Sequence, residues 1–129
     1  MKSLADLKKN KIRIAAFGNS NTEFNHWSFG RNYVSMLACN LYNLFPSSTV
    51  INCGHSGDNT QDALKRIDDV LCSNVQAVIV SFGLNDACQK RGVEPFRNDY
   101  RKFTALSGKI SFPPVRKTAG KILMRRAMT

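Results

Sequence analysis

Apolar residues in this chain follow two different patterns that alternate along its length. Short unbroken runs at residues 12–17, 49–53 and 77–82 predict buried β-strands. Between and after them, apolar residues recur at helical spacing, which predicts one helix over about 29–44, a second marked by Ala63 to Leu71, and a third from Glu94 to about Leu106. The resulting β-α-β-α-β-α order indicates an α/β fold with a parallel sheet and right-handed crossovers.

The pattern ends after Leu106, where Gly108, the pair Pro113-Pro114 and Gly120 interrupt the chain. Three strands are few for a sheet covered on both faces, so one flank would be left unpaired. An apolar edge such as residues 77–82 is prone to pair with another strand, and self-association through this open edge is therefore possible. We expect a partial domain at 11–106 and a basic, irregular tail at 107–129.

Each predicted strand is followed by a polar loop with chemistry of its own. The three loops are Gly18-Asn19-Ser20-Asn21-Thr22, Asn52-Cys53-Gly54-His55-Ser56-Gly57-Asp58 and Gly83-Leu84-Asn85-Asp86. Taken singly they are ordinary, because Ser20 could cap a helix, Gly57 could supply a positive φ, and Asn85-Asp86 could form an Asx turn. Because parallel strands end at one edge of a sheet, where ligands bind, the three loops together predict a site.

These three loops resemble the sequence blocks of the SGNH hydrolases, also called GDSL esterases and lipases. The resemblance covers about residues 11–106 and implies a three-layer α/β/α sandwich, with a flavodoxin-like parallel sheet that here lacks its last strands. It further implies that Ser20 is the nucleophile and that Gly57 and Asn85 are oxyanion donors. The Asn19 position usually carries Asp in the family, and Asn can make similar local hydrogen bonds.

The resemblance implies carboxylic ester hydrolysis. Ser20 would attack the acyl carbonyl, and the Ser20 and Gly57 amides with the Asn85 side chain would hold the oxyanion until water releases the acyl-enzyme. The expected ligand is a small acyl ester. We expect no cofactor and no metal, since His26 and His55 lie apart without carboxylates at ligand spacing.

The family's fourth block, Asp-x-x-His, supplies a general base and its orienting carboxylate, and this chain does not contain it. Loss of such partners lowers turnover by about 10⁴- to 10⁶-fold, so the resemblance implies an impaired esterase. His55 could substitute as the base, although a histidine two residues before the oxyanion glycine is more commonly a loop or rim residue. His26 fits a pocket wall or the edge of the core.

Net charge is concentrated near the C-terminus. The formal charge is +10, and residues 102–129 carry seven of the 19 lysines and arginines and none of the nine acidic residues. No interleaved pattern of aromatic and basic residues there supports base stacking, so we expect no specific nucleic-acid partner. The four cysteines lack a C-x-x-C pair, and the first nine residues lack an apolar stretch, which favours a cytoplasmic protein with reduced thiols. No stretch reaches the ~18 apolar residues of a membrane span.

Charge balance, periodicity and the family pattern all change near Phe103. We therefore expect that a frameshift or early stop replaced the later strands, and translating the downstream nucleotides in the other two frames would test this. Two other functions remain open. A flavodoxin-like module could bind phosphate at the first loop, and a non-catalytic remnant could bury its sheet edge in a partner.

Overall fold

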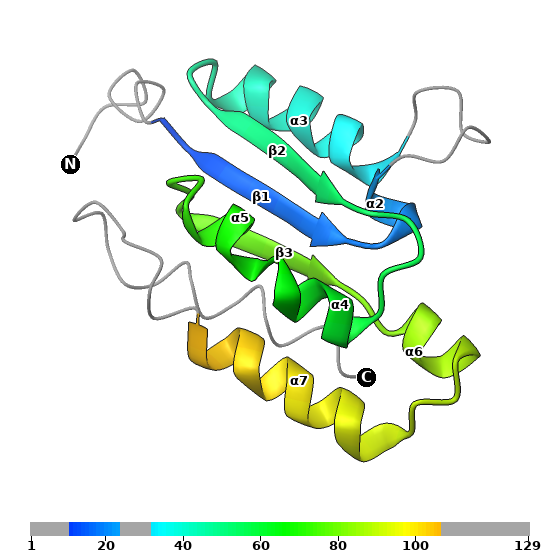
Figure 1. Ribbon diagram of the computed structural model, residues 1–129. Coiled ribbons are helices and arrows are strands. Elements are labelled where there is room, and N and C mark those ends of the chain that lie inside the picture. Colours follow the sequence, from blue (N-terminus) through cyan, green and yellow to red (C-terminus); the bar gives the residue numbers. More distant parts are fainter. Residues whose placement is uncertain (1–10, 24–31, 107–129) are drawn as a thin grey trace.

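The fold is a small parallel sheet with helices on both faces (Figure 1), seen in a computed structural model that describes residues 11–23 and 32–106. The strands are β1 (Arg13–Gly18), β2 (Thr49–Gly54) and β3 (Ala77–Ser81), arranged in the order β2-β1-β3. In the parallel register Ala15 lies beside Ile51 on one side and Val78 on the other. The three predicted strands are confirmed, each within one residue of its expected ends.

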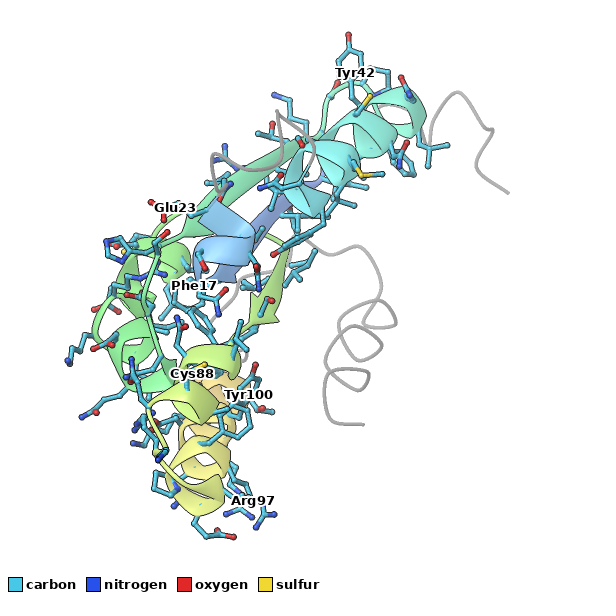
Figure 2. All side chains as sticks on the ribbon, turned by 90° about the vertical axis from the view of Figure 1, so that its right-hand side faces the viewer. Phe17, Glu23, Tyr42, Cys88, Arg97 and Tyr100 are labelled. Carbon is cyan, nitrogen blue, oxygen red and sulfur yellow. The ribbon has the colours of Figure 1, made fainter. Side chains whose placement is uncertain are left out.

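Helices connect and cover the strands. They are α2 (Ser20–Glu23), α3 (Tyr33–Leu44), α4 (Thr60–Lys65), α5 (Ile67–Leu71), α6 (Leu84–Cys88) and α7 (Val93–Leu106). Helix α3 lies on one face of the sheet, and α4 and α5 lie on the other (Figures 1 and 2). This arrangement confirms the predicted α/β/α layers and the parallel sheet.

Three details of the predicted helices are wrong. The first long helix begins at Tyr33, because Asn32 is an extended N-cap whose side chain accepts a hydrogen bond from the Ser35 amide. The second is broken at Arg66 into α4 and α5. The short helices α2 and α6 were not expected, since segments of four and five residues show no periodicity. Asn59 caps the start of α4, where its side chain accepts a hydrogen bond from the Asp62 amide at 3.0 Å.

The core lies between the sheet and the helices α4, α5 and α7. Its centre is Phe17, which is fully buried and meets Phe82 edge-on at a centroid distance of 5.0 Å. Phe103 of α7 packs against both rings at 6.0 Å. Burying an aromatic side chain of this kind contributes about 1.5–3 kcal/mol, so α7 belongs to the folded unit.

Strand β3 is an edge in the part of the chain that the structure describes, where it pairs with β1 alone. Tyr100 covers the end of this edge, since its hydroxyl donates to the Phe82 carbonyl at 3.0 Å and accepts from the Phe82 amide at 3.2 Å. No helix among the described residues is long and apolar enough to cross a membrane. The predicted tail at 107–129 and His26 lie outside the described residues.

Candidate active site

Ser20 lies where the central strand turns into a helix. It is the first residue of α2, and its side chain is half-buried. The turn forms because the amides of Thr22 and Glu23 both donate to the Asn19 carbonyl, at 2.9 Å each. Asn19 is buried, and its side-chain oxygen accepts from the Asn21 amide at 3.1 Å. Asparagine therefore makes the local hydrogen bond that this position needs.

Two glycines let α2 lie directly on the strand ends. A Cβ atom on Gly54 would come within 2.0 Å of the Glu23 amide nitrogen, and one on Gly18 would come within 2.0 Å of the Thr22 hydroxyl. Real Cβ atoms do not approach so closely, so any side chain here would push α2 away. Because neither glycine has a side chain, α2 can pack against the strand ends, and Ser20 therefore lies at the edge of the sheet.

The loop after β2 is held against α2. The His55 amide donates to the Gly18 carbonyl at 2.9 Å, and the Ser56 amide donates to the Glu23 carboxylate at 2.5 Å. Gly57 follows with φ +87°, in the left-handed region, and a Cβ there would meet nothing within 4 Å. Conformation rather than space therefore favours glycine at this turn.

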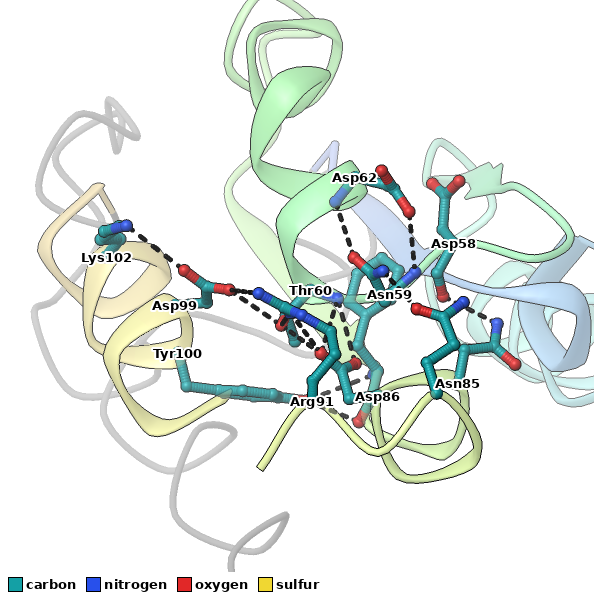
Figure 3. Close-up of polar contacts among 12 residues, drawn as sticks. Asp58, Asn59, Thr60, Asp62, Asn85, Asp86, Arg91, Asp99, Tyr100 and Lys102 are labelled. Carbon is teal, nitrogen blue, oxygen red and sulfur yellow. Dashed lines mark hydrogen bonds and ion pairs between the residues drawn. The ribbon is translucent and has the colours of Figure 1, made fainter. Parts of the chain in front are cut away.

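The loop after β3 brings Asn85 to the second loop. Gly83, with φ +126°, turns the chain into α6, on which Asn85 is half-buried. The Asn85 side-chain amide donates to the carbonyl of Asp58 at 2.8 Å (Figure 3), and Asp58 directly follows Gly57. A primary amide carries two N–H groups, so the second remains for another acceptor.

The three predicted site residues lie on the ends of three adjacent strands. Ser20 follows the central strand, Gly57 lies in the loop after β2, and Asn85 lies just after β3. The second loop links the other two, through the bond to Glu23 on one side and the Asn85 bond on the other. A hydroxyl, a backbone amide and a side-chain amide on neighbouring strand ends can bind and attack one carbonyl group.

Arg66 joins the ends of two strands at this edge, a contact that the sequence analysis did not predict. Its side chain donates to the Asp58 carboxylate at 2.6 Å, the Cys53 carbonyl at 2.8 Å and the Gly18 carbonyl at 3.1 Å. The guanidinium carbon also lies 4.6 Å from the centre of the Phe17 ring. One planar cation thus joins the ends of β1 and β2, at the position where the predicted helix breaks.

A second charged cluster lies beside Asn85 (Figure 3). Arg91 donates to Asp86 at 2.6 Å, to Asp99 of α7 at 3.1 Å and to the Thr60 hydroxyl at 2.7 Å. The Thr60 hydroxyl lies within 2.6 Å of Asp86 and 3.1 Å of Asp99, and its single hydrogen can serve one of them. The Thr60 amide also donates to Asp86, so this carboxylate anchors the start of α4. Asp86 therefore fixes the α6 segment that carries Asn85.

Hydrogen bonds outweigh burial in setting the charge states around the site. Burial disfavours the charged form of Asp99, but hydrogen bonds from Arg91, Lys102 and Thr60 lower its pKa below the usual range. Burial likewise opposes the charge of Arg91, and the two carboxylates raise its pKa. The hydrogen bond from Ser56 lowers the pKa of Glu23. All three groups are therefore charged at neutral pH.

No group of three or more His, Cys, Asp or Glu side chains that could hold a metal ion occurs in the segments 11–23 and 32–106. The thiol of Cys53 lies close to the edge, but burial raises its pKa, which disfavours the reactive thiolate. Ser20 is therefore the better candidate nucleophile at these strand ends.

Comparison with known proteins agrees with this fold. Solved structures similar to the chain include AlinE4, an SGNH-hydrolase family esterase, with 28% identity and a TM-score of 0.68 over 78% of this chain and 55% of that one. A lipase/acylhydrolase from Enterococcus faecalis has 28% identity and a TM-score of 0.64 over 75% and 52% of the two chains. Axe2, an acetyl xylan esterase from Geobacillus stearothermophilus, shares the fold at 19% identity, with a TM-score of 0.65 over 77% and 56%.

This chain therefore spans about half the length of the solved structures that it matches. No curated protein matches it. A family match extends over residues 16–115, more than half of the chain and including all three polar loops. The chain belongs to the GDSL-like lipase/acylhydrolase family.

Proposed function

We propose that this chain is a serine-dependent carboxylic ester hydrolase, with its hydrolase domain at residues 11–106. Ser20 is the nucleophile, and the oxyanion donors are the amides of Ser20 and Gly57 and the side chain of Asn85. The observation that carries the proposal is the bond from Asn85 to the Asp58 carbonyl, because it holds the side-chain amide beside the loop that contains Gly57. Family membership supports the same reaction class.

The reaction proceeds through an acyl-enzyme. The Ser20 oxygen attacks the ester carbonyl, and these donors stabilise the negative charge that develops on the carbonyl oxygen. Each such donor contributes about 10²- to 10³-fold in turnover. Collapse of the intermediate expels the alcohol, and water then releases the acid.

The sequence contains no Asp-x-x-His block, so we propose that turnover is slow compared with that of a complete triad. An oxyanion hole and binding alone retain about 10³- to 10⁴-fold over water. The substrate is a small acyl ester, since similar structures are named as an esterase, a lipase/acylhydrolase and an acetyl xylan esterase. An activated ester is the appropriate probe, because its alcohol leaves without help from an acid.

Hydrolysis of p-nitrophenyl acetate by the full chain tests the proposal. Ser20→Ala should abolish the protein-dependent rate, and Asn85→Ala should lower it about 10²-fold. Ser47→Ala is a matched control, because Ser47 is exposed in the turn before β2, at the opposite end of the strand from the site. Its loss should leave the rate of hydrolysis unchanged. A protein-dependent rate that survives in Ser20→Ala would refute the assignment of the nucleophile, and a native chain with no protein-dependent rate would favour a non-catalytic remnant.

A further inference from the structure

His55 and Asp58 form an organised pair at the site. His55 Nδ1 lies 2.9 Å from Asp58 Oδ1, and the side chains are 66% and 10% exposed. The other carboxylate oxygen of Asp58 accepts from Arg66 Nε at 2.6 Å. Each oxygen of the nearly buried Asp58 carboxylate therefore has a partner, and these two contacts hold the carboxylate in place beside the His55 ring.

This contact determines which ring nitrogen is free. A carboxylate accepts hydrogen bonds, so in neutral His55 the hydrogen resides on Nδ1 and the lone pair on Nε2. A histidine whose Nδ1 is held by a buried carboxylate has the arrangement of a general base. The His55 backbone is also fixed, because its amide bonds to the carbonyl of Gly18, two residues before Ser20.

Other groups near Ser20 are poorer bases. The Ser56 bond lowers the pKa of Glu23, which makes this carboxylate a weak proton acceptor. Burial raises the pKa of Tyr33, whose hydroxyl is paired with Thr22 at 2.8 Å, so the phenolate does not form near neutral pH.

We propose that His55, oriented by Asp58, is the general base that activates Ser20. The proposal rests on the proposed esterase function. As the Ser20 oxygen bonds to the acyl carbon, its proton moves to His55 Nε2 and the carbonyl electron pair moves to oxygen. When the intermediate collapses, the ester C–O bond breaks and the alkoxide takes the proton from Nε2. Water then attacks the acyl carbon, giving a proton to Nε2, which returns it to the departing Ser20 oxygen as the acid leaves.

Three charged groups lie around His55. Asp58 accepts from its ring, Arg66 lies behind that carboxylate, and Glu23 is close enough for its charge to be felt by the imidazole. A general base accepts a proton only in its unprotonated form, so esterase activity should rise with pH through one ionisation. Replacing His55 should remove that ionisation from the profile.

The test measures p-nitrophenyl acetate hydrolysis and its pH profile in the full chain. His55→Ala should lower kcat about 10²-fold or more with KM little changed, and added imidazole should restore part of the rate. Asp58→Asn should also lower kcat about 10²-fold, because the carboxylate no longer selects the reactive tautomer. Lys65→Ala is the matched control: Lys65 pairs with Asp62 at the same spacing and at 2.9 Å, away from the strand ends, and its loss should leave the rate unchanged.

The outcomes separate this inference from the proposed function. Hydrolysis that depends on Ser20 but persists unchanged in His55→Ala, with the same pH profile, would overturn the base assignment alone. If the native chain hydrolyses no ester, binding of phenylboronic acid, which mimics the tetrahedral intermediate, separates the two proposals. Binding that is lost in Ser20→Ala and weakened in Asn85→Ala would again overturn only the role of His55. If the chain shows neither Ser20-dependent hydrolysis nor Ser20-dependent binding of phenylboronic acid, the proposed function is overturned as well.

Discussion

Replacing Arg91 by Met should be among the most damaging single changes in this chain. Arg91 is the cation shared by two carboxylates, Asp86 and Asp99, which are only 4% and 8% exposed. Met keeps most of the side-chain volume and removes the charge and the donors. Lys102 still reaches Asp99 at 3.3 Å, so the uncompensated charge falls mainly on Asp86.

Breaking a buried ion pair by removing one partner costs about 3–5 kcal/mol. Domains of this kind are stable by about 5–15 kcal/mol, so Arg91→Met should remove a large part of the total. Urea unfolding followed by circular dichroism measures the effect, and a loss of about 4 kcal/mol shifts the midpoint by roughly 2 M at a typical slope. Arg97→Met is the control, because the Arg97–Glu94 pair is largely exposed and its loss should cost about 0–1 kcal/mol.

The loss of stability in Arg91→Met should also depend on pH. The pKa of Asp99 is lowered in the folded state. Its contribution to the free energy of unfolding is therefore complete above the usual pKa of 3.8 and is lost as pH falls through the lower folded pKa. The difference between the native chain and Arg91→Met should therefore narrow in acid. An Arg91→Met penalty no larger than that of the Arg97 control, at neutral pH, would refute this account of the cluster.

Three further changes test other contacts. Gly54→Ala places a Cβ 2.0 Å from the Glu23 amide nitrogen and should cost about 1–3 kcal/mol by urea unfolding, and an unchanged midpoint would contradict the close packing of α2. Tyr100→Phe leaves both backbone groups of Phe82 without their partner and should cost about 1–3 kcal/mol in the same assay, whereas a neutral effect would mean that water replaces the hydroxyl. Glu23→Ala should speed hydrogen exchange of the Ser56 amide; in the native chain that protection should be present above pH 4.5 and be lost as pH falls through the lowered pKa of Glu23, and equal exchange in both chains would argue against this bond.

The sequence predicted those parts of the fold that depend on short-range patterns. Apolar runs located β1, β2 and β3, and the rule that parallel strands share one edge placed the three polar loops together. The predicted positions of Ser20, Gly57 and Asn85 at adjacent strand ends follow from the same reasoning, while their roles remain predictions.

Contacts between distant polar residues could not be predicted in this way. Arg66 falls within a helical pattern, and its bonds to Gly18, Cys53 and Asp58 depend on how two strands end. Arg91 donates hydrogen bonds to residues at the start of α4, on α6 and on α7. The distances between these residues along the sequence do not follow from the periodicity of any one helix. Such bonds depend on how the sheet and helices pack, so local periodicity does not predict them.

The central claim is that Ser20, Gly57 and Asn85 surround one reacting group. A crystal structure of the full chain after reaction with an ethyl fluorophosphonate measures this directly, since the phosphonyl oxygen occupies the position of the oxyanion. The account predicts phosphorus on the Ser20 oxygen, with the phosphonyl oxygen about 2.7–3.1 Å from both the Gly57 amide and the Asn85 side-chain nitrogen. An adduct on another residue, or a phosphonyl oxygen turned to solvent away from these two donors, would contradict it.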